Sequence, residues 1–276
     1  MTYWDAIVLG FVQGVAEFLP ISSSGHLAIL QNFLQLGDLE EHLFFDVLLH
    51  LGTLGAVLFA FWKDVRELVS TGMSMLGNKK HGHGNKAERI NQRMIWFLVI
   101  ATLPLVFAAI CKDLISGLYA NPFFIGFALI VTGFLLFAAD RMGHGDKDVR
   151  SCTISDAVIV GIAQAVAVVP GLSRSGTTIA TGMLRGFDRS FAVRFSFLLS
   201  IPAVIGANLF TFIDAVQAEI NWSNMPMYLV GVLTAFVFGY CSIYALRMIV
   251  QRGKFGGFSY YCWGAGLLTL LLSLVS

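Results

Sequence analysis

Two short polar stretches interrupt this very apolar chain, and they carry the side chains that could perform chemistry. The first is Pro20-Ile-Ser-Ser-Ser-Gly-His26, with Glu17 just before it, and the second is Pro170-Gly-Leu-Ser-Arg-Ser-Gly-Thr-Thr178. The guanidinium of Arg174 can hold phosphate oxygens through two parallel hydrogen bonds. An imidazole such as that of His26 can exchange a proton near neutral pH. Together with many hydroxyls, these groups indicate a site for an anionic, phosphate-bearing ligand.

Both stretches also supply donors that suit phosphate. We expect a helix to restart after each of them, over 26–36 and 177–184, so that its first N–H groups and its positive end face the ligand. Glycines near these starts let the backbone approach a ligand closely. The hydroxyls and glycines concerned are Ser22, Ser23, Ser24, Gly25, Gly171, Ser173, Ser175, Gly176, Thr177 and Thr178.

The two stretches belong to an internal repeat. A shift of 151 positions superimposes 5–25 on 156–176. Each copy opens on an aspartate, Asp5 or Asp156, where a carboxylate suits the positive end of a helix. Each then runs as a half-apolar helix that stops at a proline. Polar broken helices in corresponding halves of an apolar chain are the best pointer in a sequence to a buried site.

The charged groups of the repeat are not duplicated. Gln13 is matched by Gln164, but Val168 stands where Glu17 would recur, and only the second copy has an arginine, Arg174. Gln13 and Glu17 are four residues apart, so they share one face of a helix. Charges at membrane depth are costly by several kcal/mol. Their presence therefore favours a functional role over simple packing.

The composition places the chain in a membrane. Hydrophobic residues make up 57% of the chain and charged residues 13%, and the mean hydropathy is +0.75; soluble domains carry about a quarter charged residues. The net charge of +1 excludes the strongly basic surface of a nucleic-acid-binding protein. Six runs are long enough to cross a bilayer, which takes roughly 17–25 apolar residues. They are 43–62, 94–111, 122–139, 195–213, 227–250 and 258–275.

The positive charges gather on one side of the predicted topology. We expect the elements 3–37 and 154–190 to dip into the bilayer and return, while the six runs cross it. Sixteen of the 18 Lys and Arg residues then lie on one side, seven of them in a loop over 63–93, whereas Lys112 lies opposite and Arg174 lies in the membrane. By the positive-inside rule the basic side is cytoplasmic, which puts both termini outside.

These observations predict an all-α polytopic membrane protein that forms one domain over 1–276. Its halves, 3–139 and 154–276, are an inverted-topology repeat joined by a link over 140–153. Each half holds one re-entrant broken-helix element and three transmembrane helices, and this odd number inverts the second half. The broken ends then meet near the middle of the bilayer. Non-helical backbone is tolerated there only if it is buried in protein or lines a wet cavity.

The two motifs resemble those of a known family. Gln13-x-x-x-Glu17, followed by Phe-Leu-Pro-Ile-Ser-Ser-Ser-Gly-His26 and by the second stretch, is similar to the undecaprenyl-pyrophosphate phosphatase family of bacteria, which is linked to bacitracin resistance. The resemblance covers nearly the whole chain. It implies hydrolysis of undecaprenyl pyrophosphate to the monophosphate and inorganic phosphate, which recycles the carrier lipid for cell-wall synthesis. It also implies a plasma-membrane enzyme with a divalent cation, Mg²⁺ or Ca²⁺, and a site that opens to the outer face.

The resemblance extends to individual residues. Glu17, Ser23, His26 and Arg174 match positions where the family's functional groups sit, and we expect them to be catalytic, with Glu17 also the candidate metal ligand. The expected substrate-binding residues are Gln13, Ser22, Ser24, Gly25, Ser173, Ser175, Gly176 and Thr178. Three nucleophiles stay open: Ser23 assisted by His26, His26 itself, or a water activated by Glu17 and His26.

Other interpretations are open at this stage. Inverted repeats with broken helices at the midplane are a transporter architecture, so the chain could carry a polyprenyl phosphate across the membrane instead of, or besides, hydrolysing its precursor. A site of the phosphatidic-acid-phosphatase type needs a histidine shortly after the Ser-Arg pair, and 177–188 contains none. Asp46 and His50 share a helix face and could shuttle protons or simply make polar contacts. A homodimer is compatible with the sequence, which does not set the oligomeric state.

Overall fold

The structure is a computed structural model that describes residues 1–27, 39–77, 86–111, 117–119, 121–217 and 222–274. Within these ranges the regular structure is entirely helical, and the one β-type contact is an isolated bridge between Lys147 and Phe187. The all-α prediction is therefore confirmed for the described part of the chain. Most of the helix expected over 26–36, as well as Lys112, falls outside it.

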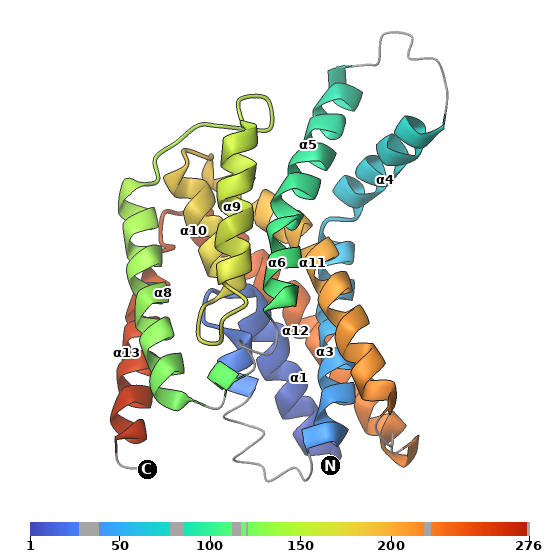
Figure 1. Ribbon diagram of the computed structural model, residues 1–276, viewed down its shortest axis with the longest axis vertical. Helices are drawn as coiled ribbons and strands as arrows, with labels where there is room; N and C mark the ends of the chain where they lie inside the picture. Colours follow the sequence, from blue (N-terminus) through green and yellow to red (C-terminus); the bar gives the residue numbers. More distant parts are fainter. Residues whose placement is uncertain (28–38, 78–85, 112–116, 120, 218–221, 275–276) are drawn as a thin grey trace.

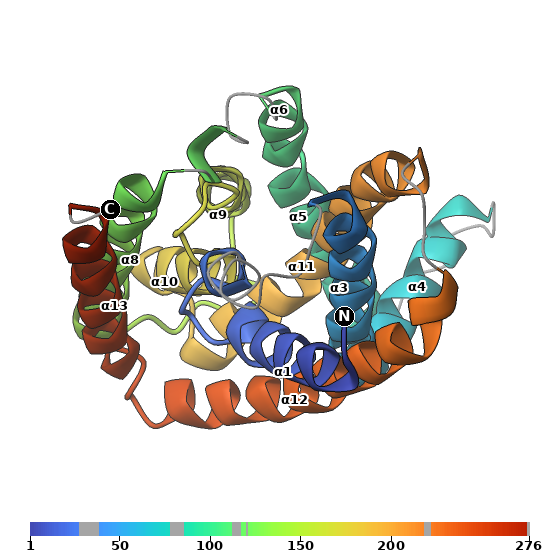
Figure 2. The same ribbon diagram turned by 90° about the horizontal axis from the view of Figure 1, so that it is seen from below.

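Two broken helical elements lie among the longer helices (Figures 1 and 2). α1 (Tyr3–Phe18) leads into a short helical stretch at residues 23–27, and α9 (Ile154–Val166) leads into α10 (Arg174–Leu184). In Figure 1, α1 starts at the lower end of the molecule and α9 starts at the upper end. The breaks fall in the two polar stretches, as the sequence predicts.

Both broken elements begin with the same local structure. The hydroxyls of Thr2 and Thr153 accept the backbone N–H groups of Asp5 and Asp156, and each aspartate side chain accepts the threonine N–H in return. Such a capping box satisfies two backbone donors that the helix itself leaves unpaired. The two aspartates therefore have the structural role that their position indicates.

A buried carboxylate fixes the second broken element at the end that lies away from its break. Asp156 is fully buried and accepts from Lys147 at 3.1 Å and from Arg185 at 2.9 Å. The backbone of Lys147 also donates to Gly186 and accepts from Asp188, both at 2.9 Å. These bonds tie the link before α9 to the turn after α10, so the hairpin is closed by charge pairs as well as by packing.

Among the described residues, four helical segments are long and apolar enough to cross a bilayer. They fall on four of the six predicted runs, which supports a multi-pass membrane protein. These segments are α5 (Lys86–Thr102) with α6 (Pro104–Ile110), α8 (Pro122–Met142), Arg189–Leu209 within α11 (Arg189–Gln217), and the 3-10 turn η1 (Trp222–Asn224) with α12 (Met225–Gln251).

The other two predicted runs are also helical, but they differ in form. α3 (Leu39–Ala60) meets α4 (Trp62–Leu76) at an 86° bend, and the part of α3 over Phe44–Ala60 is long and apolar enough for a span when it is taken together with α4. α13 (Gly257–Ser273) has 17 residues, which is the lower end of the roughly 17–25 that a span requires. It packs along α8 at one edge of the molecule (Figure 1).

The segment 63–93, expected as a loop, contains most of α4 and the start of α5, which corrects that expectation. Its many charges favour a loop by composition, but their spacing leaves one apolar helix face. The side chains on this face are all strongly exposed: Trp62, Val69, Met73 and Leu76. An amphipathic helix at nearly a right angle to a spanning helix suits the membrane–water interface.

The main apolar core lies where five helices converge. It contains Phe18 of α1, Leu136 of α8, Ile179 of α10, Phe197 of α11 and Leu246 of α12, each almost completely buried. The core thus lies directly beside the first polar stretch, because Phe18 follows Glu17 in the chain. It supplies the dry walls around the polar groups.

Close backbone contact holds α1 against α12, the long helix at the base of Figure 2. Gly10 and Gly14 of α1 face Gly231, Ala235 and Gly239 of α12, and a Cβ added at Gly14 would lie 2.7 Å from the Ala235 carbonyl oxygen. Membrane helices associate through small residues of this kind because lipid gives them little hydrophobic driving force.

We therefore expect Gly14→Ala to destabilise the protein by about 1–3 kcal/mol through overpacking. Gly264→Ala on α13 is the matched control, since a Cβ there would meet no atom within 4 Å; alanine should be neutral or slightly stabilising at that position. Thermal unfolding of both variants in the same detergent measures the difference. Equal unfolding temperatures would contradict the close α1–α12 contact.

Candidate active site

One ion pair joins the two broken elements. A guanidinium nitrogen of Arg174, the first residue of α10, donates to Oε1 of Glu17 near the end of α1. The side chains keep only 18% and 8% of their exposure, respectively. The sequence predicted that these charges converge, and the structure brings them into direct contact. The pair lies at the point where both helices are interrupted.

Glu17 is the centre of this network. Its second oxygen, Oε2, accepts from the Ser23 hydroxyl at 2.8 Å and from the Gln13 amide at 3.2 Å. The Nε2 atom of His50, on α3, lies 3.9 Å from the same oxygen. The structure therefore gathers Gln13, Glu17, Ser23 and Arg174 as predicted. It also places His50 at the site, in addition to the predicted His26.

The two polar loops share a local design. The hydroxyls of Ser22 and Ser24 are 3.5 Å apart, and those of the matching Ser173 and Ser175 are 3.3 Å apart. Ser173 also caps α10 by accepting the backbone N–H of Gly176 at 3.2 Å. These serines shape the loops through local bonds.

Backbone strain concentrates in the first loop. Ser22 has a φ of +69°, and it is the one non-glycine residue in the described part of the chain with a left-handed conformation. Gly171 takes a φ of +89° in the second loop, as a glycine can without penalty. Strained residues of this kind cluster at functional sites, where the surrounding structure holds them.

Close approach of the two loops explains one of the other glycines. A Cβ at Gly176 would lie 2.8 Å from the Cβ of Pro20, so the second loop packs tightly against the first. A Cβ at Gly25 would meet Ile125 at an ordinary 3.5 Å. Of these two predicted binding glycines, therefore, only Gly176 is required by contact between the loops.

His26 makes contacts that the sequence did not indicate. Its Nδ1 atom lies 2.7 Å from the Ser22 carbonyl oxygen, and its Nε2 atom is hydrogen-bonded to the hydroxyl of Tyr261 on α13, with the two rings stacked. Both ring nitrogens are thus engaged, and neither bonds Ser23. Tyr119 is a second tyrosine at the site, because it bonds Ser24 and donates to the Val168 carbonyl at 3.4 Å.

Thr178 is already engaged within the helices. Its hydroxyl bonds the Arg174 carbonyl at 2.9 Å and the hydroxyl of Ser196 on α11. These bonds hold the first turn of α10 against α11. In this arrangement Thr178 supports the position of Arg174, and its contacts do not include Glu17 or Ser23.

Several buried polar atoms near the breaks have no hydrogen-bond partner among the described residues. They are Oε1 of Gln13, both amide atoms of Gln164 and the hydroxyl of Thr177, and each of these residues is at most 5% exposed. An unpaired buried polar group costs about 1–3 kcal/mol. Such groups favour water or ligand atoms in the spaces they face.

The donor set for a metal ion is small. No cluster of three or more His, Cys, Asp or Glu side chains that could hold a metal occurs in the described part of the chain. The Glu17 carboxylate already accepts hydrogen bonds from Arg174, Ser23 and Gln13, which leaves few lone pairs for a metal ion. These residues fit a cation that takes most of its ligands from substrate oxygens and water, as Mg²⁺ commonly does.

Asp46 and His50, which share a helix face, contribute to the site in different ways. His50 Nδ1 lies 2.8 Å from the backbone carbonyl of Asp46, so the ring is fixed by its own helix and points Nε2 toward Glu17. His50 belongs to the site by its distance to Glu17. Asp46 contributes its backbone carbonyl, which bonds the His50 ring.

The fold and the site together define a multi-pass membrane protein with a buried, strongly hydrogen-bonded centre that suits a phosphorylated ligand. Comparison with known proteins identifies the family of this membrane protein. Residues 6–268 match the family described as bacitracin resistance protein BacA, and the chain belongs to this family.

Curated relatives cover the chain from end to end. The undecaprenyl-diphosphatase of Alkaliphilus metalliredigens is 38% identical over 276 residues and covers 100% of both chains. That of Methanosphaera stadtmanae is 38% identical over 276 residues, with 98% of each chain covered. That of Moorella thermoacetica is 40% identical over 262 residues, with 95% of this chain and 94% of its own covered.

The central ion pair should show strong thermodynamic coupling. We expect Arg174→Met alone to lower stability by about 3–5 kcal/mol, because it leaves the buried Glu17 carboxylate without a cation. The double variant Glu17→Gln/Arg174→Met should recover more than half of that loss, since no uncompensated charge is left. Thermal unfolding of the single and double variants in one detergent measures the coupling. Losses that simply add would contradict a direct buried pair.

Proposed function

We propose that this protein hydrolyses undecaprenyl pyrophosphate to undecaprenyl phosphate and inorganic phosphate. The observation that carries the proposal is the buried Glu17–Arg174 pair with Ser23 hydrogen-bonded to its carboxylate. Membership of the bacitracin resistance family and full-length relatives named undecaprenyl-diphosphatase support it. The product is the carrier lipid of cell-wall synthesis, so its recycling links the enzyme to bacitracin resistance.

Arg174 is the primary phosphate-binding group. In the free protein it is held by Glu17, and a pyrophosphate offers it more oxygens and more negative charge than one carboxylate does. Transfer of Arg174 to the substrate stabilises charge on the phosphoryl oxygens as the transition state develops. It also frees Oε1 of Glu17.

Ser23 is the nucleophile best supported by geometry. Its hydroxyl already donates to Glu17 at 2.8 Å, whereas the ring of His26 is engaged by Ser22 and Tyr261. The Ser23 oxygen attacks the terminal phosphorus, its proton passes to Glu17, and undecaprenyl phosphate leaves as the bond to the bridging oxygen breaks. A water then attacks the phosphoserine and leaves as part of the phosphate, while Glu17 returns the proton to the Ser23 oxygen.

His26 and the tyrosines act around this centre. The His26–Tyr261 bond spans the first polar loop and α13 and fixes the orientation of the imidazole. From there His26 can exchange protons with the released phosphate. Ser22, Ser24, Ser173 and Ser175 line the two loops and supply hydroxyls to the pyrophosphate oxygens. Gln13 orients Glu17.

A divalent cation, Mg²⁺ or Ca²⁺, belongs to this proposal. Glu17 is the protein group that would hold it, and the ion would supply neutralisation of the pyrophosphate charge. The remaining ligands would come from the substrate and from water, since the described residues offer no further carboxylate at Glu17.

The architecture we propose is an inverted repeat within one membrane domain. The halves are 3–139 and 154–276, with re-entrant elements at 3–37 and 154–190. Matching capping boxes and matching serine pairs support the repeat, and the opposite starting ends of α1 and α9 in Figure 1 support its inversion. With the basic residues inside, both termini are outside and the site opens to the outer face of the plasma membrane.

Transport of the lipid phosphate is the weaker alternative. A rocking transporter needs two halves that can exchange roles, but only the first has a glutamate at the break and only the second has an arginine. The charge pairs at Asp156 also close one end of the α9–α10 hairpin. Unequal halves with a nucleophile at the centre favour hydrolysis.

Phosphate release from undecaprenyl pyrophosphate by the purified chain in detergent is the direct test. With Mg²⁺ and Ca²⁺ each supplied, we expect Arg174→Ala to lower the rate by about 10²–10³-fold, because it removes a charged donor to the transition state. Arg141→Ala, an exposed arginine that stacks on Phe137, should retain the native rate. No release by well-folded native protein under either cation would overturn the proposed hydrolysis.

The nucleophile can be tested by trapping the intermediate. Acid quenching during turnover of substrate labelled on its terminal phosphate should leave label on Ser23, and Ser23→Ala should lose about a thousandfold or more in rate. Peptide mapping of the quenched protein locates the label. Label on a histidine would instead identify His26, and native turnover without any trapped label would favour direct attack by water.

A further inference from the structure

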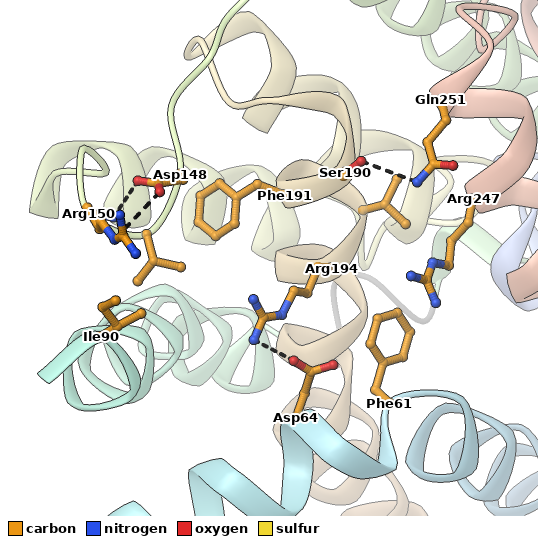
Figure 3. Close-up of a pocket in the computed structure, with 12 residues that line it drawn as sticks. Phe61, Asp64, Ile90, Asp148, Arg150, Ser190, Phe191, Arg194, Arg247 and Gln251 are labelled. Atoms are coloured by element: carbon orange, nitrogen blue, oxygen red, sulfur yellow. Dashed lines mark hydrogen bonds and ion pairs between the residues drawn. The ribbon is translucent and has the colours of Figure 1, made fainter. Parts of the chain in front are cut away.

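A cavity lined by charged and apolar side chains lies away from Glu17 and Arg174. It has a volume of 330 Å³, within the range of roughly 300–1,000 Å³ typical of small-molecule sites. Its walls come from the α3–α4 corner, the start of α5, the 140–153 link, the start of α11 and the end of α12 (Figure 3). Both halves of the chain therefore contribute to it, and it shares no lining residue with the catalytic network.

The lining carries an excess of positive charge. Three arginines, Arg150, Arg194 and Arg247, line the cavity with two aspartates, Asp64 and Asp148, which leaves one net positive charge. Arginine groups between membrane helices at the basic side of a membrane protein are typical of sites for lipid phosphates.

The aspartates are already committed to other groups. Asp64 pairs with an NH2 nitrogen of Arg194, while the Nε atom of that arginine has no partner among the described residues. Asp148 accepts the backbone N–H of Arg150 at 2.7 Å, which lowers the pKa of its carboxyl, and it lies 4.0 Å from the Arg150 guanidinium. Neither carboxylate pairs with the third arginine.

Arg247 is the free cation of the cavity. Its guanidinium stands over the ring of Phe61 at 5.4 Å, and no described residue accepts a hydrogen bond from it. The ring holds the group at the cavity wall, as Figure 3 shows, and leaves its N–H donors unused. A guanidinium stacked in this way is pre-organised to bind phosphate through two hydrogen bonds.

The cavity lies at the depth of lipid headgroups. α4 leaves the spanning helix α3 at 86° and carries the exposed apolar face that begins at Trp62, next to Phe61. Tyr244, one turn before Arg247 on α12, is 65% exposed. Exposed Trp and Tyr side chains mark the membrane interface. Ile90, Val149 and Phe191 add apolar wall to the same cavity, which suits a ligand with both a phosphate and hydrocarbon.

We propose that this cavity binds the phosphate group of an anionic membrane phospholipid, with Arg247 as the principal ligand-binding residue and the Nε of Arg194 as a second donor. The lipid bridges the α3–α4 corner, the 140–153 link and the ends of α11 and α12. Its binding is separate from substrate turnover and stabilises the junction of the two halves. The inference does not rest on the proposed hydrolysis.

Native mass spectrometry of the full chain in detergent tests the proposal. The probes are dioleoyl phosphatidylglycerol, dioleoyl phosphatidylcholine and soluble glycerol 3-phosphate. We expect the native chain to bind phosphatidylglycerol about tenfold more tightly than phosphatidylcholine. Both lipids carry a phosphate, but the choline cation of phosphatidylcholine cancels its net charge and is repelled by the net positive lining of the cavity. Phosphatidylglycerol should also raise the unfolding temperature.

Three variants separate this site from general attraction to the basic surface. Arg247→Gln should remove the preference for phosphatidylglycerol, and Arg247→Lys should keep most of it by retaining the charge. Arg252→Gln is the matched control, because Arg252 is an exposed arginine at the end of the same helix that does not line the cavity. It should bind as the native chain does.

Three outcomes would overturn the proposal. The first is equal binding of the two lipids by the native chain. The second is an Arg247→Gln variant that keeps the preference, or an Arg252→Gln variant that loses it equally. The third is displacement of phosphatidylglycerol by glycerol 3-phosphate at matched concentration, which would assign the cavity to a soluble phosphate. The Arg247→Lys variant guards against misfolding as the cause of lost binding.

Discussion

A buried ion pair between two interrupted helices is the interaction on which the rest of this structure depends. Glu17 and Arg174 come from different halves of the chain, and both are largely withdrawn from solvent. Burying two charges costs several kcal/mol per ion unless geometry and further hydrogen bonds compensate. Ser23 supplies one such bond to Glu17. The pair also requires the loops to be held together, and the tight packing at Gly176 and the glycine-lined contact of α1 with α12 meet that requirement.

The two halves repeat the scaffold but not the chemistry. Threonine–aspartate capping boxes open both broken elements, and paired serine hydroxyls recur in both loops. The capping boxes and serine pairs fix the backbone conformation at the helix starts and in the loops, and both halves require that conformation. The reactive groups are divided, because a carboxylate and a guanidinium attract one another only if each half supplies one sign. Gln13 bonds Glu17 in the first half, but the amide of its counterpart Gln164 has no hydrogen-bond partner among the described residues. This follows from the division of charges, because Val168 offers no carboxylate to bond. A duplicated fold has thus become one asymmetric site.

The sequence indicated the polar loops, the convergence of Glu17 with Arg174 and most of the spans, because these rest on local composition and on the repeat. It missed Tyr261 and Tyr119, which lie far along the chain from the histidine and serine they bond. Neither tyrosine belongs to one of the polar stretches, so the local sequence carries no signal of such a contact. The right-angle turn into α4 was missed for a related reason, since charge content indicates exposure but only the 3.6-residue spacing of the apolar side chains reveals a helix.

Each broken element has one end away from its break, and the two ends are held differently. This difference bears on how a lipid substrate could reach the site. Asp156 is fully buried between Lys147 and Arg185, so the end of the α9–α10 hairpin is fixed by two charge pairs and by backbone bonds to the link. Asp5, its counterpart, caps α1 but pairs with no cation in the described part of the chain. Opening the α9–α10 end would expose an aspartate with two separated cations. Among the described residues, the start of α1 is held by a helix cap and by packing against α12, without a charge pair at Asp5. This energetic asymmetry supports the proposed opening of the site at the side of the first broken element, which is the side that also carries the proposed nucleophile.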